Sequence, residues 1–85
     1  MLHRIKIKWP YLAHILEGKK TFEVRINDRD YQVGDELEFD PIDDDRYPVV
    51  QVVPVFEVVY VHCGYGVAPG FVVLGIQQKQ IATKG

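Results

Sequence analysis

Hydrophobic and polar residues alternate along two early segments of the chain, residues 3–8 and 21–26. In the first segment, Ile5 and Ile7 share one face and three basic residues share the other. In the second, one face carries Phe22, Val24 and Ile26, and the opposite face carries Lys19, Thr21, Glu23 and Arg25. A period of two is typical of a half-buried strand, so both segments are predicted strands. The polar face of the second strand is either the solvated side of a sheet or the wall of a binding site.

A short helix is predicted between these two strands, over about residues 10–17. Pro10 suits the first helical position, where no N–H donor is needed, and Gly18 suits the left-handed position after the helix. An apolar stripe follows one helical face through Tyr11, Leu12, Ile15 and Leu16. A helix of two turns is unstable alone in water, so we expect it to dock on a sheet.

The remainder of the chain reads as strands separated by turns. Residues 37–39 begin a strand with its apolar side chains inward, and residues 71–76 form the last strand. Residues 49–62 are rich in β-branched and aromatic residues. Because Pro54 has no N–H for a ladder, this stretch is an edge strand, a bulged strand or two shorter strands.

These elements predict an α+β fold that is mostly β. We expect a small closed or half-open barrel of about five or six strands, with the one short N-terminal helix at one end. Residues 1–77 would form a single domain, and residues 78–85 a polar C-terminal tail.

Composition restricts the location and the functions to be considered. The 85 residues suffice for one small core, and no run approaches the roughly 18 apolar residues of a membrane helix. The N-terminus does not resemble a secretory signal, and the single Cys63 cannot form an internal disulfide, so we expect a cytoplasmic protein. The net charge of −2 lacks the basic excess of proteins that bind nucleic acid mainly through phosphates. Any recognition of RNA or a nucleotide would therefore occur in a pocket with local positive charge.

The run GKKTFEVR at residues 18–25 resembles the signature of the ASCH domain, Gly-x-Lys-x-x-Glu-x-Arg after a short helix. Gly18, Lys20, Glu23 and Arg25 match that form. The continuation NDRDYQVGD at 27–35, with His3 and the GFVVLGI run at 70–76, looks more specifically like a small family of uncharacterised bacterial and phage-borne domains allied to ASCH. The resemblance covers residues 1 to about 77.

The resemblance implies a PUA-like β-barrel with a helix beside a cleft, and with RNA or a nucleotide as the ligand. One ASCH branch deacetylates 4-acetylcytidine with a Lys, a Thr and a more distant Glu. Lys20 matches that Lys, but Glu23 stands at the Thr position, and Glu57 is only a loose candidate for the distant Glu. If this activity held here, Lys20 and Glu23 would be the catalytic residues.

The residue chemistry permits a nucleotide site without the family name. Arg25 offers a planar fork for phosphate, Glu23 can accept from an exocyclic base amine, and Lys20 suits either group. The candidates for stacking on a base are Trp9, Tyr31 and Tyr65, although Trp9 is expected mainly to anchor the helix in the core. His3, Asp28 and Arg29 complete the candidate ligand-binding set.

Two structural interpretations stand beside the site. Alternating charges on a strand are usually a solvated face with weak ion pairs, and Glu23 and Arg25 can pair with each other or with Asp28 or Arg29 as a structural network. Neither His62-Cys63 nor residues 43–45 has the ligand spacing of a metal site, so no metal or other cofactor is expected. Three functions remain open: an RNA- or nucleotide-binding domain, a small amidohydrolase, and a protein-interaction module contacting its partner through residues 40–45 and 49–62.

Overall fold

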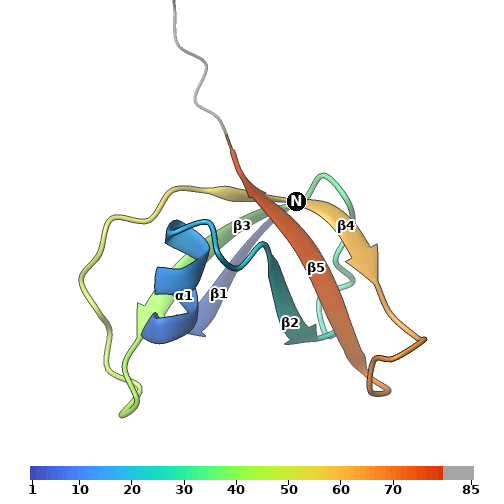
Figure 1. Cartoon of the computed structure of the whole chain (residues 1–85), viewed down its shortest axis with the longest axis horizontal. Helices are drawn as coiled ribbons and strands as arrows, with labels where there is room; N and C mark the ends of the chain where they lie inside the picture. Colours follow the sequence, from blue (N-terminus) through green and yellow to red (C-terminus); the bar gives the residue numbers. More distant parts are fainter. Residues whose placement is uncertain (80–85) are drawn as a thin grey trace, which may run out of the picture.

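The computed structural model describes residues 1–79, which form one curled sheet and one short helix (Figure 1). The five strands occur in the order β1-β3-β4-β5-β2, with β1 parallel to β3 and every other neighbouring pair antiparallel. In chain order the elements are β1 (Leu2–Lys8), α1 (Trp9–Leu16), β2 (Phe22–Ile26), β3 (Glu36–Ile42), β4 (Phe56–His62) and β5 (Phe71–Gln78). The predicted fold class, a small mostly-β barrel with one early helix, is confirmed.

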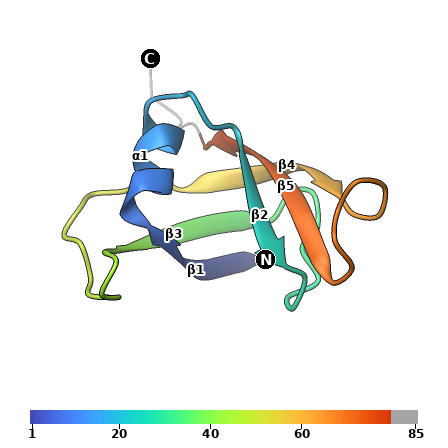
Figure 2. The same cartoon turned by 60° about the horizontal axis from the view of Figure 1, so that its bottom comes forward.

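The sheet is a half-barrel whose two edge strands, β1 and β2, do not pair with each other within the described residues. Two arginines cross the opening instead. Arg25 Nη1 donates to the carbonyl oxygen of Lys6 at 2.9 Å, and Arg29 Nη1 donates to the carbonyl oxygen of Arg4 at 2.9 Å. Figure 2 shows α1 at one end of this curled sheet, where β1 ends and β2 begins. The opening therefore has a strand edge on each side and the helix at one end.

The helix has the boundaries that its end residues predict. Pro10 lies in its first turn, and Gly18 follows the helix with a φ of 79°, a left-handed conformation that favours glycine. Leu12 and Ile15 are buried against the sheet, and α1 contacts β1 and β3. Trp9 packs against the core from the start of the helix, as expected of an anchor.

The core fills the concave side of the sheet. Leu37 and Phe39 point inward as predicted, and α1 closes over the same cluster. The buried cluster consists of Ile5, Ile7, Leu12, Ile15, Tyr31, Leu37, Phe39, Phe56, Val58, Val72, Leu74 and Ile76. Every strand except β2 contributes a hydrophobic side chain to this cluster.

Two strand boundaries differ from the prediction. The stretch before and around Pro54 is not a strand: β4 begins at Phe56, and a bulge between Val58 and Tyr60 shifts its register against β5. Residues 49–55 instead form an extended segment in which Val50 and Val52 are almost fully exposed. At the other end, β5 continues through Gln78, one residue into the predicted tail, and residues 80–85 of that tail lie outside the described residues. No helix within residues 1–79 has the length and apolar composition needed to cross a membrane.

Candidate functional site

The polar face of β2 is the face that points into the molecule. Glu23 is 5% exposed and Arg25 is half-buried, whereas Phe22, Val24 and Ile26 are 45%, 48% and 61% exposed. The alternation correctly predicted a strand, but the expectation that its apolar residues form the half-buried face is wrong. The reason is the pairing with β5, which places Glu23 opposite the fully buried Leu74.

Glu23 is the centre of an ion-pair network on this inward face. Lys20 Nζ contacts Glu23 Oε1, and Arg25 Nη1 lies 3.3 Å from Glu23 Oε2. The three side chains are largely shielded from water, with exposed fractions of 18% for Lys20, 27% for Arg25 and 6% for Glu23. Pairing of Glu23 with Arg25 was one of the two structural interpretations, and the geometry confirms it. A solvated face of weak pairs does not describe this strand.

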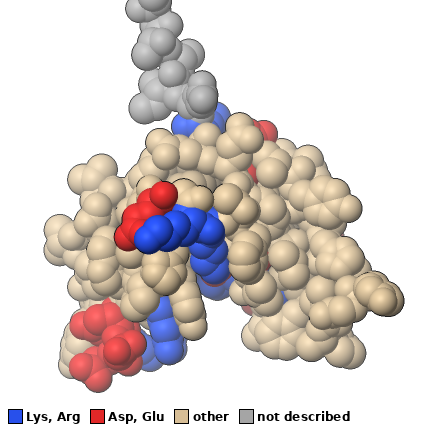
Figure 3. All heavy atoms as spheres, in the orientation of Figure 1, with Lys and Arg blue, Asp and Glu red and all other residues tan. Residues whose placement is uncertain are grey.

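A cleft of about 580 Å³ lies over this network, between the edges of β1 and β2. Five of its lining residues are cationic and one, Glu23, is a carboxylate; the full lining is Lys6, Ile7, Lys8, Tyr11, Lys20, Glu23, Val24, Arg25, Ile42 and Arg46. Figure 3 shows a hollow on this side of the molecule, and Lys and Arg atoms lie in it. A protein of net charge −2 thus concentrates positive charge at one place.

Lys20 is held at the cleft by two aromatic rings as well as by Glu23. Its Nζ lies 5.4 Å from the ring centroid of Tyr11 and 5.2 Å from that of Phe22, which is cation–π distance. The backbone N–H groups of Lys19 and Lys20 both donate to the carbonyl oxygen of His14. These hydrogen bonds cap the C-terminal end of α1 and fix the path of the chain after it, so that Lys20 lies at the cleft.

A protein-family model matches the chain over all but the last two residues of the five strands. Residues 2–76 match a family described as Domain of unknown function (DUF3850). The chain belongs to the DUF3850 family. A comparison with curated proteins finds none that matches. The match includes every residue that lines the cleft, so the cleft lies wholly within the DUF3850 domain.

The aromatic side chain that lines the DUF3850 cleft is not one of the predicted stacking residues. Tyr31 is 4% exposed and packs in the core, and Trp9 also packs against the core. Tyr65 is 95% exposed in the loop between β4 and β5 and does not line the cleft. Tyr11, which the helical pattern assigned to an apolar stripe, is 52% exposed and borders the cleft instead.

Three further predicted ligand residues lie away from the cleft. His3 is buried, and its Nε2 shares a 2.7 Å hydrogen bond with Asp35 Oδ2, with the Tyr31 ring 4.8 Å away. Arg29 is one of the two residues that cross the opening, and Asp28 is exposed in the loop after β2. None of the three lines the cleft. The contacts of His3 and Arg29 are with other parts of the fold.

Sequence reasoning missed three cationic residues and one aromatic residue of the cleft, namely Lys6, Lys8, Arg46 and Tyr11. The alternation in residues 3–8 did place Lys6 and Lys8 on one face. Nothing in the local pattern indicated that this strand edge would face β2, because the order of strands in the sheet decides it. Arg46 comes from the loop after β3, a segment that shows only turn-forming residues and charge.

The cleft contains few of the groups that a metal site or an amidohydrolase requires. Within residues 1–79, no group of three His, Cys, Asp or Glu side chains is placed to hold a metal ion. Glu57, the loose candidate for the distant Glu, does not line the cleft, and neither does Thr21, the threonine directly before β2. Lys20 and Glu23 do meet there, so the two residues named as catalytic are in contact with each other.

The His3–Asp35 contact makes a pH-dependent contribution to stability. The hydrogen bond with His3 is the main cause that lowers the pKa of Asp35 from 3.8 to about 2; the Gln32 N–H and the Met1 amino group add to it, against the effect of burial. Because the folded pKa is the lower one, this stability is present above pH 3.8 and is lost as the pH falls toward 2.

We therefore expect Asp35→Asn to lower the free energy of unfolding at pH 7 by roughly 1–3 kcal/mol, as for a buried hydrogen-bond partner. Urea denaturation at a series of pH values measures this, with the exposed Asp44→Asn as the control. The difference in the free energy of unfolding between wild type and Asp35→Asn is expected to narrow below pH 3.8. If this difference stayed constant down to pH 2, the ionised Asp35 carboxylate would not be its source.

Proposed function

We propose that the DUF3850 cleft binds a nucleotide unit of RNA. The observation that carries the proposal is the charge of the cleft, five cations around one buried carboxylate in a protein that is acidic overall. A phosphate ester attached to a base with polar edges is complementary to that combination. A net negative charge also disfavours binding to bulk nucleic acid, which favours recognition of one or a few nucleotides in a pocket.

The contacts in the cleft assign the phosphate to other residues than the sequence suggested. Arg25 was expected on phosphate, but its Nη1 already donates to the Lys6 carbonyl and to Glu23. The phosphate would instead contact cations of the cleft that have no carboxylate partner among residues 1–79. Lys6 and Lys8 are two of these cations. Glu23 lines the cleft, and each of its oxygens keeps a lone pair beside its contact with Lys20 or Arg25, so it can also accept from an exocyclic base amine.

Tyr11 provides the flat surface on which a base stacks. It is exposed at the border of the cleft and carries no hydrogen bond among the described residues that would orient it elsewhere. The resemblance of residues 18–25 to the ASCH signature supports the same proposal, since it implies a PUA-like RNA-binding domain with Lys20, Glu23 and Arg25 at the ligand.

A second candidate function, hydrolysis of an acylated nucleoside, is favoured by the contact between Lys20 and Glu23. No Ser, Thr or Cys lines the cleft, so the attacking group would be a water molecule. Glu23 would take its proton, and the products from 4-acetylcytidine would be cytidine and acetate. Release of acetate that disappears in Glu23→Gln, while amide NMR spectra show the variant still folded, would establish this function; absence of acetate with wild type over a long incubation would leave binding alone.

Replacing Tyr11 tests the binding function directly. We expect Tyr11→Ala to weaken binding of cytidine 5′-monophosphate about tenfold, because stacking on one aromatic ring contributes about 1–3 kcal/mol per base. Tyr11→Phe keeps the ring and is expected to bind like wild type, and isothermal titration calorimetry measures both. Equal affinity of wild type and Tyr11→Ala would remove Tyr11 from the site, and absence of binding to wild type would refute the proposed function.

A further inference from the structure

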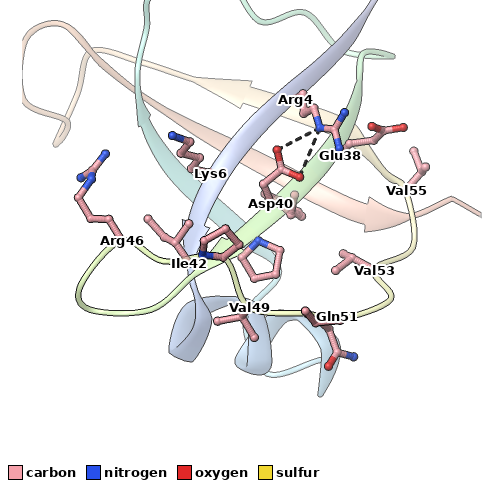
Figure 4. A pocket seen from close by; sticks show the side chains of 14 residues that line it. Arg4, Lys6, Glu38, Asp40, Ile42, Arg46, Val49, Gln51, Val53 and Val55 are labelled. Atoms are coloured by element: carbon pink, nitrogen blue, oxygen red, sulfur yellow. Dashed lines mark hydrogen bonds and ion pairs between the residues drawn. The ribbon is translucent and has the colours of Figure 1, made fainter.

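A second hollow of about 570 Å³ adjoins the cleft on the outer side of β1 and β3. This hollow lies between those strands and the extended segment at residues 48–55 (Figure 4). Lys6, Ile42 and Arg46 line both the cleft and the second hollow. The two hollows therefore adjoin at these three residues near the edge of β1, and together they offer more space than a single nucleotide unit requires.

The junction of the two hollows carries positive charge that no carboxylate neutralises. Within residues 1–79, neither Lys6 nor Arg46 forms an ion pair, whereas Lys20 and Arg25 pair with Glu23. Both junction side chains are exposed. An anion placed at the junction would gain two attractive partners without breaking an existing ion pair.

The turn that carries Arg46 is held by hydrogen bonds within the loop. The Asp43 carbonyl accepts from the Arg46 N–H, and Asp43 Oδ1 accepts from the N–H groups of Asp45 and Tyr47. Arg46 itself has a φ of 67°, a left-handed conformation uncommon for a residue with a side chain. These hydrogen bonds hold the backbone of the loop at Arg46, and Figure 4 shows Arg46 and Lys6 toward the same end of the second hollow.

The far part of the second hollow is mainly apolar with a polar rim. Pro41, Val49 and Val53 supply apolar surface, Gln51 supplies an amide, and Glu38 supplies a carboxylate. Arg4 and Asp40 are already paired with each other there, at 3.0 Å. An apolar wall with a few polar groups at its rim suits the flat face and polar edge of a second base.

We propose that the two hollows hold two successive nucleotides of a single RNA strand, with the linking phosphate on Lys6 and Arg46. This inference rests on the proposed function, because it takes the first nucleotide to lie in the cleft beside Tyr11 and Glu23. It adds the minimum ligand length and the direction in which the strand leaves the cleft, across the edge of β1 toward residues 48–55.

The test compares cytidine 5′-monophosphate with the dinucleotide pCpC by isothermal titration calorimetry at one salt concentration. We expect pCpC to bind wild type at least about tenfold more tightly, since one more stacked base and one more phosphate contact are gained. Gln51→Glu places a negative charge in the second hollow only, so it is expected to remove most of that gain and leave monophosphate binding unchanged. Arg46→Ala is also expected to reduce the gain, and Lys19→Ala, which removes an exposed cation outside both hollows, is the control.

The outcomes separate this inference from the proposed function. Equal binding of the monophosphate and pCpC to wild type would overturn the inference and leave a mononucleotide site standing. A gain for pCpC that survives in Gln51→Glu and in Arg46→Ala would also overturn it, because the second nucleotide would then lie elsewhere. Absence of binding by either ligand would refute the proposed function, and the inference with it.

Discussion

Replacing Glu23 with leucine is expected to lower the free energy of unfolding by about 3 kcal/mol, because it leaves two largely buried cations without their counter-ion. Lys20 and Arg25 are 18% and 27% exposed, and both contact this one carboxylate. In a domain of this size the loss corresponds to a decrease in Tm of roughly 15 °C. Differential scanning calorimetry and urea denaturation measure it.

Two matched variants show whether the buried network is the cause. Glu17→Gln breaks the exposed pair between Glu17 and Lys19, and it is expected to change stability by less than about 0.5 kcal/mol. Lys20→Met added to Glu23→Leu removes one unpaired cation and is expected to recover part of the loss. If Glu23→Leu were as stable as wild type, the ion-pair network around Glu23 would contribute nothing to the free energy of unfolding.

The second large effect is expected at the helix, where Leu12→Ala should cost about 3 kcal/mol of folding stability. Leu12 is fully buried and is one of two buried side chains that dock α1, an eight-residue helix too short to persist alone. Loosening α1 also displaces Tyr11 from the border of the cleft. We therefore expect Leu12→Ala to weaken nucleotide binding in the fraction of protein that remains folded, measured by calorimetry at 10 °C.

Leu16→Ala on the same helix is the control. Leu16 is 36% exposed, so removing its side chain is expected to cost less than about 1 kcal/mol and to leave affinity unchanged. If Leu12→Ala lowered folding stability and nucleotide affinity no more than Leu16→Ala, then the docking of α1 would not be what positions Tyr11 at the cleft.

Much of the fold was predictable because it is encoded locally. The period of two, the Pro10 and Gly18 boundaries and the turn residues gave the helix, four strands and the half-open barrel. The stretch at 49–62 was harder, since β-branched residues continue through 49–55 although Pro54 and the neighbouring loop keep those residues out of the sheet. Propensity for a strand cannot decide whether a partner strand is within reach.

The candidate site was predictable only in part. The GKKTFEVR run pointed to Lys20, Glu23 and Arg25, which do come together. Which face of β2 is inward was not predictable, because two polar residues in an apolar pattern usually mark the solvent side. The parity follows instead from the register against β5, which is a long-range property.

The errors in the candidate site have two physical causes. His3 and Tyr31 have side chains that suit ligands, but each also fills a buried position when a polar partner is at hand, as Asp35 is for His3. Lys6 and Arg46 were missed because strand order and a loop turn bring them to the cleft from positions 40 residues apart. Contacts of that separation leave no local trace in a single sequence.

The most direct measurement is a backbone amide NMR titration with cytidine 5′-monophosphate, 4-acetylcytidine and a short single-stranded RNA, with free acetate followed in the same samples. We predict concentration-dependent shifts that cluster at residues 6–8, at Tyr11, at Lys20 and at residues 23–25, which line the cleft. Shifts confined to other surfaces, or no shifts with any of the three ligands, would contradict a nucleotide site between β1 and β2 and would direct the search to protein partners.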